Sequence, residues 1–266
     1  MVINPAPADT GIRFRRTDIG EDAYVDALAE NVSCTARSTT ISCGEASVTT
    51  IEHILSALTG MGVDNALIDI DNVEVPILDG SAKPYIDAIW KDGFETQDAP
   101  RRYIELKEAV EIRNDENGSI VRIEPSEEPS YDITIDFNSR VLGIQQATWN
   151  DSIVYAEEIG TCRTFVFFHE LEFLYNNGLV KGGDVENAIV IVEHPVTDEQ
   201  IEKMTKLFNV PALKVREDGY LSNLRLRFPN ECARHKMLDL IGDLRLCGGF
   251  LKAKVTAVKA GHGINT

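Results

Sequence analysis

The chain has 266 residues, 43% of them hydrophobic, which is enough for one large domain or two of ordinary size with buried cores. Its 43 acidic residues exceed 26 Lys and Arg, and the formal charge of −17 argues against nucleic acid or an anionic bilayer as the partner of the whole surface. No apolar run approaches the roughly 20 residues that span a bilayer, so we expect no stable membrane anchor and a cytoplasmic location.

The first part of the chain reads as short strands and two apolar helices separated by glycines. The predicted elements are strands at Ile12–Arg15, within Cys34–Ser42 and at Ala66–Ile70, and helices from near Val48 to Gly60 and at Lys83–Trp90.

Five scattered cysteines without a Cys-x-x-Cys pair predict free, mostly buried thiols.

A polar, proline-containing stretch at Gln97–Arg102 predicts a boundary between two domains, residues 1–98 and 99–266. A second set of strands and helices follows it. These are strands at Tyr103–Ile112, Ile120–Ile123, Tyr131–Phe137, Asn187–Val192 and Phe250–Lys259, and helices at Phe168–Asn176, Thr197–Phe208 and around His235.

A faint internal repeat relates the two parts. His53 and His235 each open an apolar helix that reaches a glycine seven residues later, and a strand comes next. The segregation of strands and helices predicts the α+β class, with two sheets backed by helices and an active site between the repeats.

The strongest chemical signal is His235 with Asp239, because residues four apart in a helix project from one face and can hold one metal ion together. His53 offers a third ligand, and Glu52, directly before it, offers a carboxylate that could activate metal-bound water. This is the set of groups that a hydrolytic zinc centre needs.

Each residue also has an ordinary interpretation: a lone histidine is usually structural, and a His-x-x-x-Asp pair is often a surface ion pair. Two more residues complete the reaction scheme. Near the end of the chain, His262 could protonate a departing amine, and Asp243 could orient that imidazole, although a solvated helix carboxylate is the alternative for Asp243.

Motifs along nearly the whole chain resemble the zinc-dependent UDP-3-O-acyl-N-acetylglucosamine deacetylase family of lipid A biosynthesis. The segments that carry the resemblance are Asn4–Arg16, Thr50–Leu58, Asp64–Ala66, Pro76–Ser81, Cys162–Phe165, Gly182–Gly183, Asn187–Val190, Arg234–Leu244 and Ala260–His262.

The resemblance implies that zinc is bound by His53, His235 and Asp239, with Glu52 as general base. It gives His262 the role of general acid or electrostatic stabiliser, with Asp243 as its support. It further implies that Thr164 helps to hold the oxyanion and that Phe165 contacts the substrate. Lys236 and Lys259 resemble lysines that meet the substrate diphosphate, and ordinary surface charge is the alternative for both.

The family fold implies two domains of similar topology, each a β-sheet layered with two helices, with the active site in the cleft between them. An insert at 188–216, with strands at Ile189–Val192 and Leu213–Val215 around a helix at Glu199–Phe208, would line the passage for the fatty acyl chain. Family members usually carry a further segment before Asn4, so we expect the first strands of domain one to be absent.

The implied reaction is hydrolysis of the N-acetyl group of UDP-3-O-(3-hydroxyacyl)-N-acetylglucosamine to the free amine and acetate. The chain is similar to the Bacteroidetes form that is fused to a hydroxyacyl-carrier-protein dehydratase, of which nothing is present here. Two alternatives stay open. One is a shortened, inactive module that binds a UDP-sugar or an acyl chain, and the other is a generic amidase without nucleotide recognition.

Overall fold

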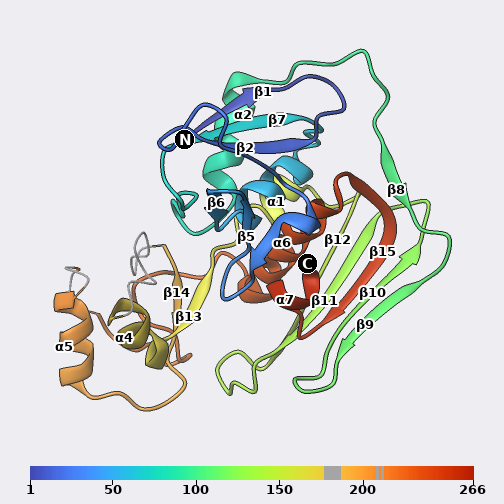
Figure 1. The fold of residues 1–266 in the computed structure, drawn as a ribbon. Helices are drawn as coiled ribbons and strands as arrows, with labels where there is room; N and C mark the ends of the chain where they lie inside the picture. Colours follow the sequence, from blue (N-terminus) through green and yellow to red (C-terminus); the bar gives the residue numbers. More distant parts are fainter. Residues whose placement is uncertain (177–186, 208–209, 211–212) are drawn as a thin grey trace.

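Two β-sheets enclose a pair of central helices in the computed structural model (Figure 1). The structure describes residues 1–176, 187–207, 210 and 213–266. The α+β class with two helix-backed sheets is confirmed. Within these ranges, no helix is long and apolar enough to cross a membrane.

The first sheet has four strands, and its buried face packs on helices α1 and α2. β2 alternates between buried and more exposed side chains, so Ile12 and Phe14 point into the core while Arg13 points outward. Its strands, in order across the sheet, are β1 (Val2–Pro5), β7 (Ala66–Ile70), β2 (Ile12–Arg16) and β3 (Tyr24–Asp26).

A small three-stranded sheet leads from this first sheet into α1. The helix carries Ile54, Leu55 and Leu58, all fully buried, at helical spacing. The elements of this region are η1 (Ala29–Asn31), β4 (Val32–Cys34), β5 (Thr40–Cys43), β6 (Ala46–Thr49), α1 (Glu52–Gly60) and α2 (Lys83–Asp92).

The second sheet has six strands and packs on α6. Across it run β12 (Ile144–Asn150), β11 (Ser130–Asp136), β15 (Phe250–Val258), β10 (Ser119–Pro125) and β9 (Val110–Asn114), with β8 (Tyr103–Glu105) paired to the start of β15. The helices of this part are α3 (Tyr155–Glu158), α6 (Glu231–Leu244), η2 (Arg245–Cys247) and α7 (His262–Asn265).

A smaller unit projects beside the two sheets and has an apolar cluster of its own. It contains β13 (Phe165–Phe167), α4 (Phe168–Asn176), β14 (Ile189–Ile191) and α5 (Asp198–Leu207). β14 pairs in parallel with β13, so the strand–helix–strand unit begins earlier than predicted. Residues 213–215 form no strand, because their backbone makes only a single bridge from Val215 to Leu221. The predicted helix end at Phe208 and the Gly182–Gly183 motif lie outside the described residues.

Several local predictions were wrong for identifiable reasons. Val48 lies in β6, not in a helix, and α1 starts only after Thr50, whose φ of 60° turns the chain. The predicted strand Tyr103–Ile112 is two strands with different partners, β15 and β10. β12 was missed because it is a polar edge strand. The cysteines are free, as predicted, but Cys34, Cys43 and Cys247 are exposed.

The central helices α1 and α6 approach each other closely at one glycine. A Cβ atom at Gly242 would lie 2.0 Å from the backbone oxygen of Glu52, so only glycine permits this contact. Gly60, at the end of α1, likewise abuts the ring of Tyr155, whose hydroxyl shares a 2.6 Å hydrogen bond with Ser56. Both glycines noted in the internal repeat therefore serve helix packing.

Replacement of Gly242 by alanine tests this packing. The added methyl group must displace the start of α1, so we expect Gly242→Ala to lower the free energy of unfolding by about 1–3 kcal/mol. Chemical denaturation measures the change. Gly249→Ala is the control, because its Cβ would meet the nearest atoms at 3.4 Å or more, and it should stay within about 1 kcal/mol of wild type. Equal stability of both variants would contradict the tight contact.

A partly buried acceptor ties the projecting unit to the large sheet. Glu193 follows β14, and its carboxylate accepts hydrogen bonds from the Ser139 hydroxyl and from the backbone N–H of Arg140 in the loop after β11. The Ser139 hydrogen bond and the backbone donors lower the pKa of Glu193 to about 2.

This pKa predicts a specific loss of stability in acid. Since the folded-state pKa lies below the ordinary 4.5, the interaction is fully present above that pH and is lost as the pH falls from 4.5 toward about 2. The melting-temperature difference between wild type and Glu193→Gln should therefore shrink over this range. Glu116→Gln, at an exposed turn, should show no such trend. A difference that stays constant from pH 6 to 2 would refute the role of Glu193.

Candidate metal centre

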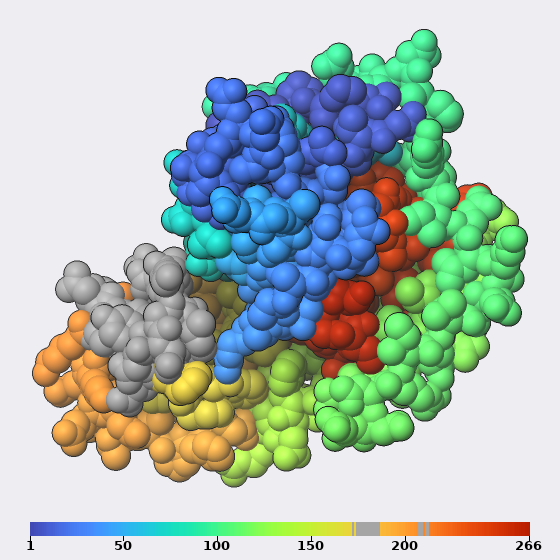
Figure 2. Space-filling model, viewed as in Figure 1, coloured from blue at the N-terminus to red at the C-terminus, as the bar shows by residue number. Residues whose placement is uncertain are grey.

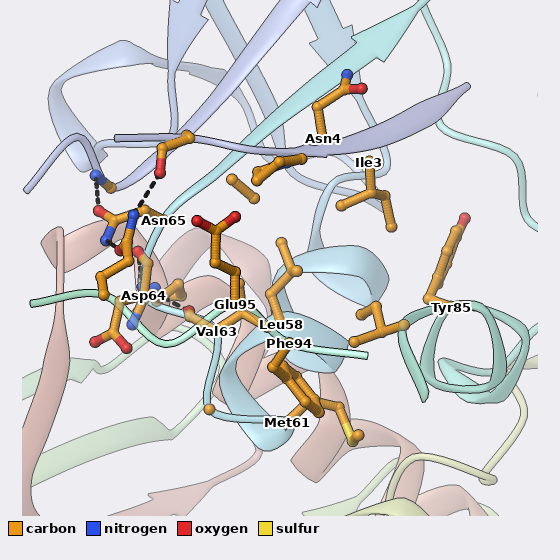
Figure 3. Close-up of a pocket in the computed structure, with 18 of the residues that line it drawn as sticks. Ile3, Asn4, Leu58, Met61, Val63, Asp64, Asn65, Tyr85, Phe94 and Glu95 are labelled. Carbon is orange, nitrogen blue, oxygen red and sulfur yellow. Dashed lines mark hydrogen bonds between the residues drawn. The ribbon is translucent and has the colours of Figure 1, made fainter. Parts of the chain in front are cut away.

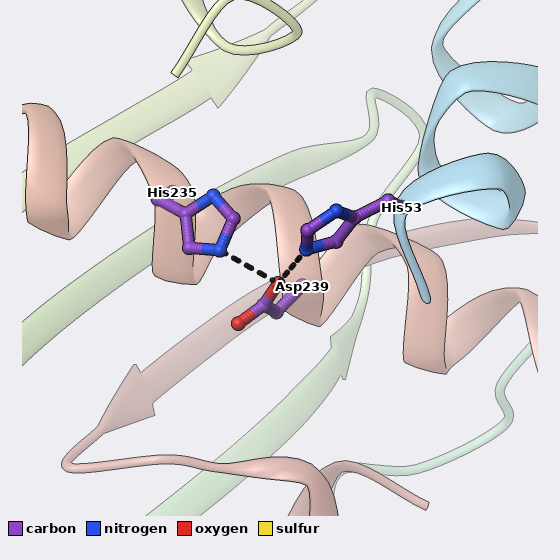
Figure 4. A group of neighbouring side chains, drawn as sticks. All are labelled: His53, His235 and Asp239. Atoms are coloured by element: carbon purple, nitrogen blue, oxygen red, sulfur yellow. Dashed lines mark ion pairs between the residues drawn. The ribbon is translucent and has the colours of Figure 1, made fainter. Parts of the chain in front are cut away.

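Three side chains from the two halves of the chain converge between α1 and α6. The candidate ligand atoms of His53, His235 and Asp239 all lie within 4.8 Å of one another (Figure 4). Nε2 of His53 is 3.6 Å and Nε2 of His235 is 3.4 Å from Oδ1 of Asp239. All three residues are buried, so the alternative of a surface ion pair is excluded.

The group has the features of a divalent metal site. Among the described residues, Oδ1 of Asp239 and Nδ1 of His53 are buried atoms without a hydrogen-bond partner. A buried carboxylate oxygen without a donor is costly unless a cation satisfies it. Two imidazoles and a carboxylate are suitable ligands for several divalent metals, and they leave positions open for water or substrate.

His235 is oriented from outside the cluster. Its Nδ1 lies 3.1 Å from the carbonyl oxygen of Cys162, so this nitrogen carries the proton and Nε2 faces Asp239 with a free lone pair. Burial lowers the pKa of His235 to about 4 against the opposing charge of Asp239. The ring is therefore neutral at physiological pH, as a metal ligand requires.

An internal ion pair fixes the segment that carries this carbonyl. The Arg163 backbone N–H and its Nε both donate to Oε1 of Glu231, at 3.1 and 2.9 Å. Glu231 is fully buried in the first turn of α6. Residues 162–165 are thereby held against the same helix that presents His235.

Glu52 lies at the start of α1, beside His53, and its side chain is 3% exposed. Burial raises the pKa of this carboxylate, against the opposing effect of His262 and His53. Its Oε2 accepts a 3.0 Å hydrogen bond from the backbone N–H of Thr39. A carboxylate with a raised pKa is a better proton acceptor than an exposed one.

His262 and Asp243 form a buried pair beside the centre. Nδ1 of His262 donates to Oδ2 of Asp243 at 2.9 Å, and Nε2 lies 3.9 Å from Oδ2 of Asp239. Burial opposes the charged imidazole, but the charge and hydrogen bond of Asp243 outweigh it and raise the pKa of His262 to about 9. Asp243 is 1% exposed, so a solvated helix carboxylate is excluded.

The two predicted diphosphate lysines are placed differently. Lys236 is largely buried, and its Nζ lies 2.7 Å from Oδ2 of Asp239, so it is part of the centre and not ordinary surface charge. Lys259, at the end of β15, is partly exposed and pairs with Asp136 at 2.9 Å. Their role as diphosphate contacts stays a prediction.

Thr164 and Phe165 lie at the junction of three segments. The Thr164 N–H donates to the Gly80 carbonyl and its carbonyl accepts from Ile189 N–H, both at 2.8 Å. The Phe165 ring meets the edge of His235 with centroids 6.4 Å apart. Both residues are partly buried, and their roles in oxyanion and substrate binding stay predictions.

A separate cavity of ≈1410 Å³ lies beside β1 in the first half of the chain (Figure 3). Its wall includes Leu58 of α1, Met61 directly after that helix and Tyr85 of α2. None of the three candidate metal ligands lines it within the described part of the chain.

Several supporting residues have no signal in the sequence. Thr39 contacts both Glu52 and Asp243, and Asn265 donates to Asp243 at 2.8 Å. The Cys162 carbonyl contacts Nδ1 of His235, and the buried carboxylate of Glu231 accepts a hydrogen bond from Arg163. Only Gly242 had a recognisable signal, its position in the internal repeat.

The fold and the centre together define an α+β protein with a buried group of two histidines and an aspartate that could hold a metal ion, a set of ligands that hydrolytic sites use. Residues 1–206 and 205–266 match the family LpxC: UDP-3-O-acyl N-acetylglycosamine deacetylase. The chain belongs to this family.

Named relatives from several bacteria are similar to the chain. It is 40% identical to the bifunctional enzyme LpxC/FabZ of Porphyromonas gingivalis over 98% of this chain and 56% of that protein, and 39% identical to the one of Bacteroides thetaiotaomicron over 100% and 58%. The UDP-3-O-acyl-N-acetylglucosamine deacetylase of Teredinibacter turnerae is 37% identical over 100% and 80%. The chain thus spans little more than half of the bifunctional relatives.

Metal binding is directly measurable. We expect the purified chain to bind one divalent ion, and His53→Ala to weaken binding by more than the roughly 10–100-fold that loss of an outer hydrogen bond costs. Competition with a chromophoric chelator gives the affinity. His194→Ala is the control, because His194 is an exposed histidine outside the cluster. Equal affinity of wild type and His53→Ala would exclude this residue as a ligand.

Proposed function

We propose that the chain is a zinc-dependent deacetylase that hydrolyses the N-acetyl group of UDP-3-O-(3-hydroxyacyl)-N-acetylglucosamine, releasing acetate and the free amine, in lipid A biosynthesis. The observation that carries the proposal is the buried cluster of His53, His235 and Asp239, with the buried carboxylate of Glu52 and the buried imidazole of His262 beside it. Family membership and the name of the Teredinibacter turnerae relative support the substrate.

His53, His235 and Asp239 would hold the zinc ion. The donor set fits zinc, which prefers nitrogen and carboxylate ligands and few of them. When bound, zinc supplies Lewis acidity toward water and the amide carbonyl. Lys236 neutralises the second oxygen of Asp239, which leaves Oδ1 as the ligand atom.

Glu52 is the proposed general base. Its raised pKa and its position next to His53 suit it to accept a proton from the attacking water. The hydrogen bond from the Thr39 N–H holds Oε2, so Oε1 is the oxygen available for the proton.

His262 is the proposed general acid. With a pKa of about 9 it carries a proton at neutral pH, and Asp243 fixes Nδ1, so Nε2 is the nitrogen that presents the proton to the departing amine. Before that step the imidazolium also stabilises negative charge on the acyl group. Thr164 would add a neutral hydroxyl donor for the same charge.

The nucleotide part of the substrate needs a local cationic patch on an acidic protein. We assign two lysines to the diphosphate: Lys236, which pairs with Asp239, and Lys259, three residues before His262 in the chain. In the structure both ammonium groups are paired with carboxylates, so substrate binding would exchange Asp136 for phosphate at Lys259.

An apolar wall leads from the centre into the projecting unit and is the proposed surface for the acyl chain. Phe137 packs against Phe165 and Phe167 with ring centroids 5.4 and 6.0 Å apart. The second apolar cluster, which includes Leu171 and Val190, lies on the other face of β13 and β14 and supports this wall from behind. Such a lining suits a hydrocarbon chain.

A dehydratase domain, fused or neighbouring, is the proposed partner, supported by the names of the bifunctional relatives.

The general base can be tested separately from the metal. We expect Glu52→Gln to retain zinc at wild-type stoichiometry and to release acetate about 10²–10⁴-fold more slowly, because the amide cannot accept the proton. Zinc analysis and an acetate-release assay measure the two effects. Glu45→Gln, at an exposed turn, is the control. Undiminished turnover in Glu52→Gln would reject the assigned base.

The same assay separates the alternatives. UDP should compete with the substrate, whereas a generic amidase would be insensitive to UDP. An inactive binding module would bind UDP without releasing acetate from the wild-type chain, and that outcome would reject the proposed function.

A further inference from the structure

Thr39, just before β5, connects two carboxylates that lie on different helices. Its backbone N–H donates to Oε2 of Glu52 at 3.0 Å, and its hydroxyl donates to Oδ1 of Asp243 at 2.6 Å. Its carbonyl oxygen accepts from the N–H of Ile51 at 3.4 Å. Thr39 is 0% exposed. One residue thus spans the distance from the start of α1 to the end of α6.

The hydroxyl of Thr39 also affects the imidazole. Oδ2 of Asp243 accepts hydrogen bonds from His262 at 2.9 Å and from Asn265 at 2.8 Å, so the Thr39 hydroxyl completes a set of donors on both carboxylate oxygens. The same hydroxyl lies 3.3 Å from Nδ1 of His262. Donors on both oxygens fix the carboxylate plane, and the plane fixes the ring that shares its proton. Figure 2 shows the segment around Thr39 (blue) directly against the C-terminal segment (red).

We propose that Thr39 is a positioning residue for the reaction, which holds the carboxylate of Glu52 and the Asp243–His262 pair in one fixed arrangement. The inference rests on the proposed function of Glu52 and His262. A proton acceptor and a proton donor that act in turn on one tetrahedral centre must face it from constant directions, and small displacements are costly. The backbone of Thr39 sets the first group and its side chain sets the second.

The alternative is that the Thr39 hydroxyl serves only the stability of the fold, as neighbouring hydroxyls do. Thr40 provides the comparison, because its hydroxyl bonds to the hydroxyl of Thr49 at 2.8 Å, within the small sheet and away from the centre. Thr39→Val and Thr40→Val each remove one hydroxyl and keep the side-chain shape. Thr39→Ser keeps the hydroxyl, and all three variants keep the backbone N–H that holds Glu52.

The experiment compares these variants in the zinc-loaded full chain by kcat, KM, zinc content and the imidazole N–H proton resonance of His262. For Thr39→Val we expect kcat to fall about 10–100-fold with KM within about threefold of wild type and zinc content unchanged. The His262 N–H resonance should shift in this variant. Thr39→Ser should recover kcat to within about threefold, and Thr40→Val should match wild type in all four measurements.

Two results would overturn the proposal: a Thr39→Val protein with wild-type kcat and resonance, or one whose loss of activity only follows a loss of zinc or of folded protein. The resonance does not depend on turnover. A wild-type chain that releases no acetate would therefore count against the proposed function, while an unshifted resonance in Thr39→Val would count against the role of Thr39.

Discussion

The close approach of α1 to α6 is the constraint on which the candidate centre depends. Gly242 lets the backbone of Glu52 lie against α6, and the next residue, His53, then reaches the face of that helix that carries His235 and Asp239. The helix α1, which packs on the first sheet, carries His53, and α6, which packs on the second sheet, carries His235 and Asp239. The centre can therefore form only when both halves of the chain have folded and packed together, which links its geometry to the stability of the whole core.

Burial makes the charge balance of the centre decisive. Three buried carboxylates, Glu52, Asp239 and Asp243, face one ammonium, Lys236, and one imidazolium, His262, so an excess of one negative charge remains. Uncompensated charge in a protein interior costs several kcal/mol per ion. A divalent cation would change the net charge of these groups from −1 to +1. It would also bind Oδ1 of Asp239, which has no hydrogen-bond partner. The stability of the apoprotein and its affinity for metal are thus two consequences of one arrangement.

The sequence predicted what is encoded in spacing and in recognisable motifs. Four-residue spacing placed His235 and Asp239 on one helix face, and the strands predicted at Ile12–Arg15 and Ala66–Ile70 are β2 and β7. It did not predict what depends on packing over long separations. The helix start after Thr50 depends on one residue with positive φ, and β12 carries a polar edge pattern that resembles a loop. The role of Thr39 arises from a partner 204 residues away, which no local pattern contains.

The supporting contacts also connect the candidate metal centre with the proposed acyl-chain surface. The segment 162–165 holds His235 through the Cys162 carbonyl and then continues as β13 into the projecting unit, where β14 pairs with it. The buried Arg163–Glu231 pair prevents this segment from moving independently of α6. A displacement of β13 by a bound chain would therefore act on the orientation of His235, a candidate metal ligand. The same rigidity gives a physical reason why recognition of the acyl chain and the chemistry at the amide would depend on each other, although they involve different residues.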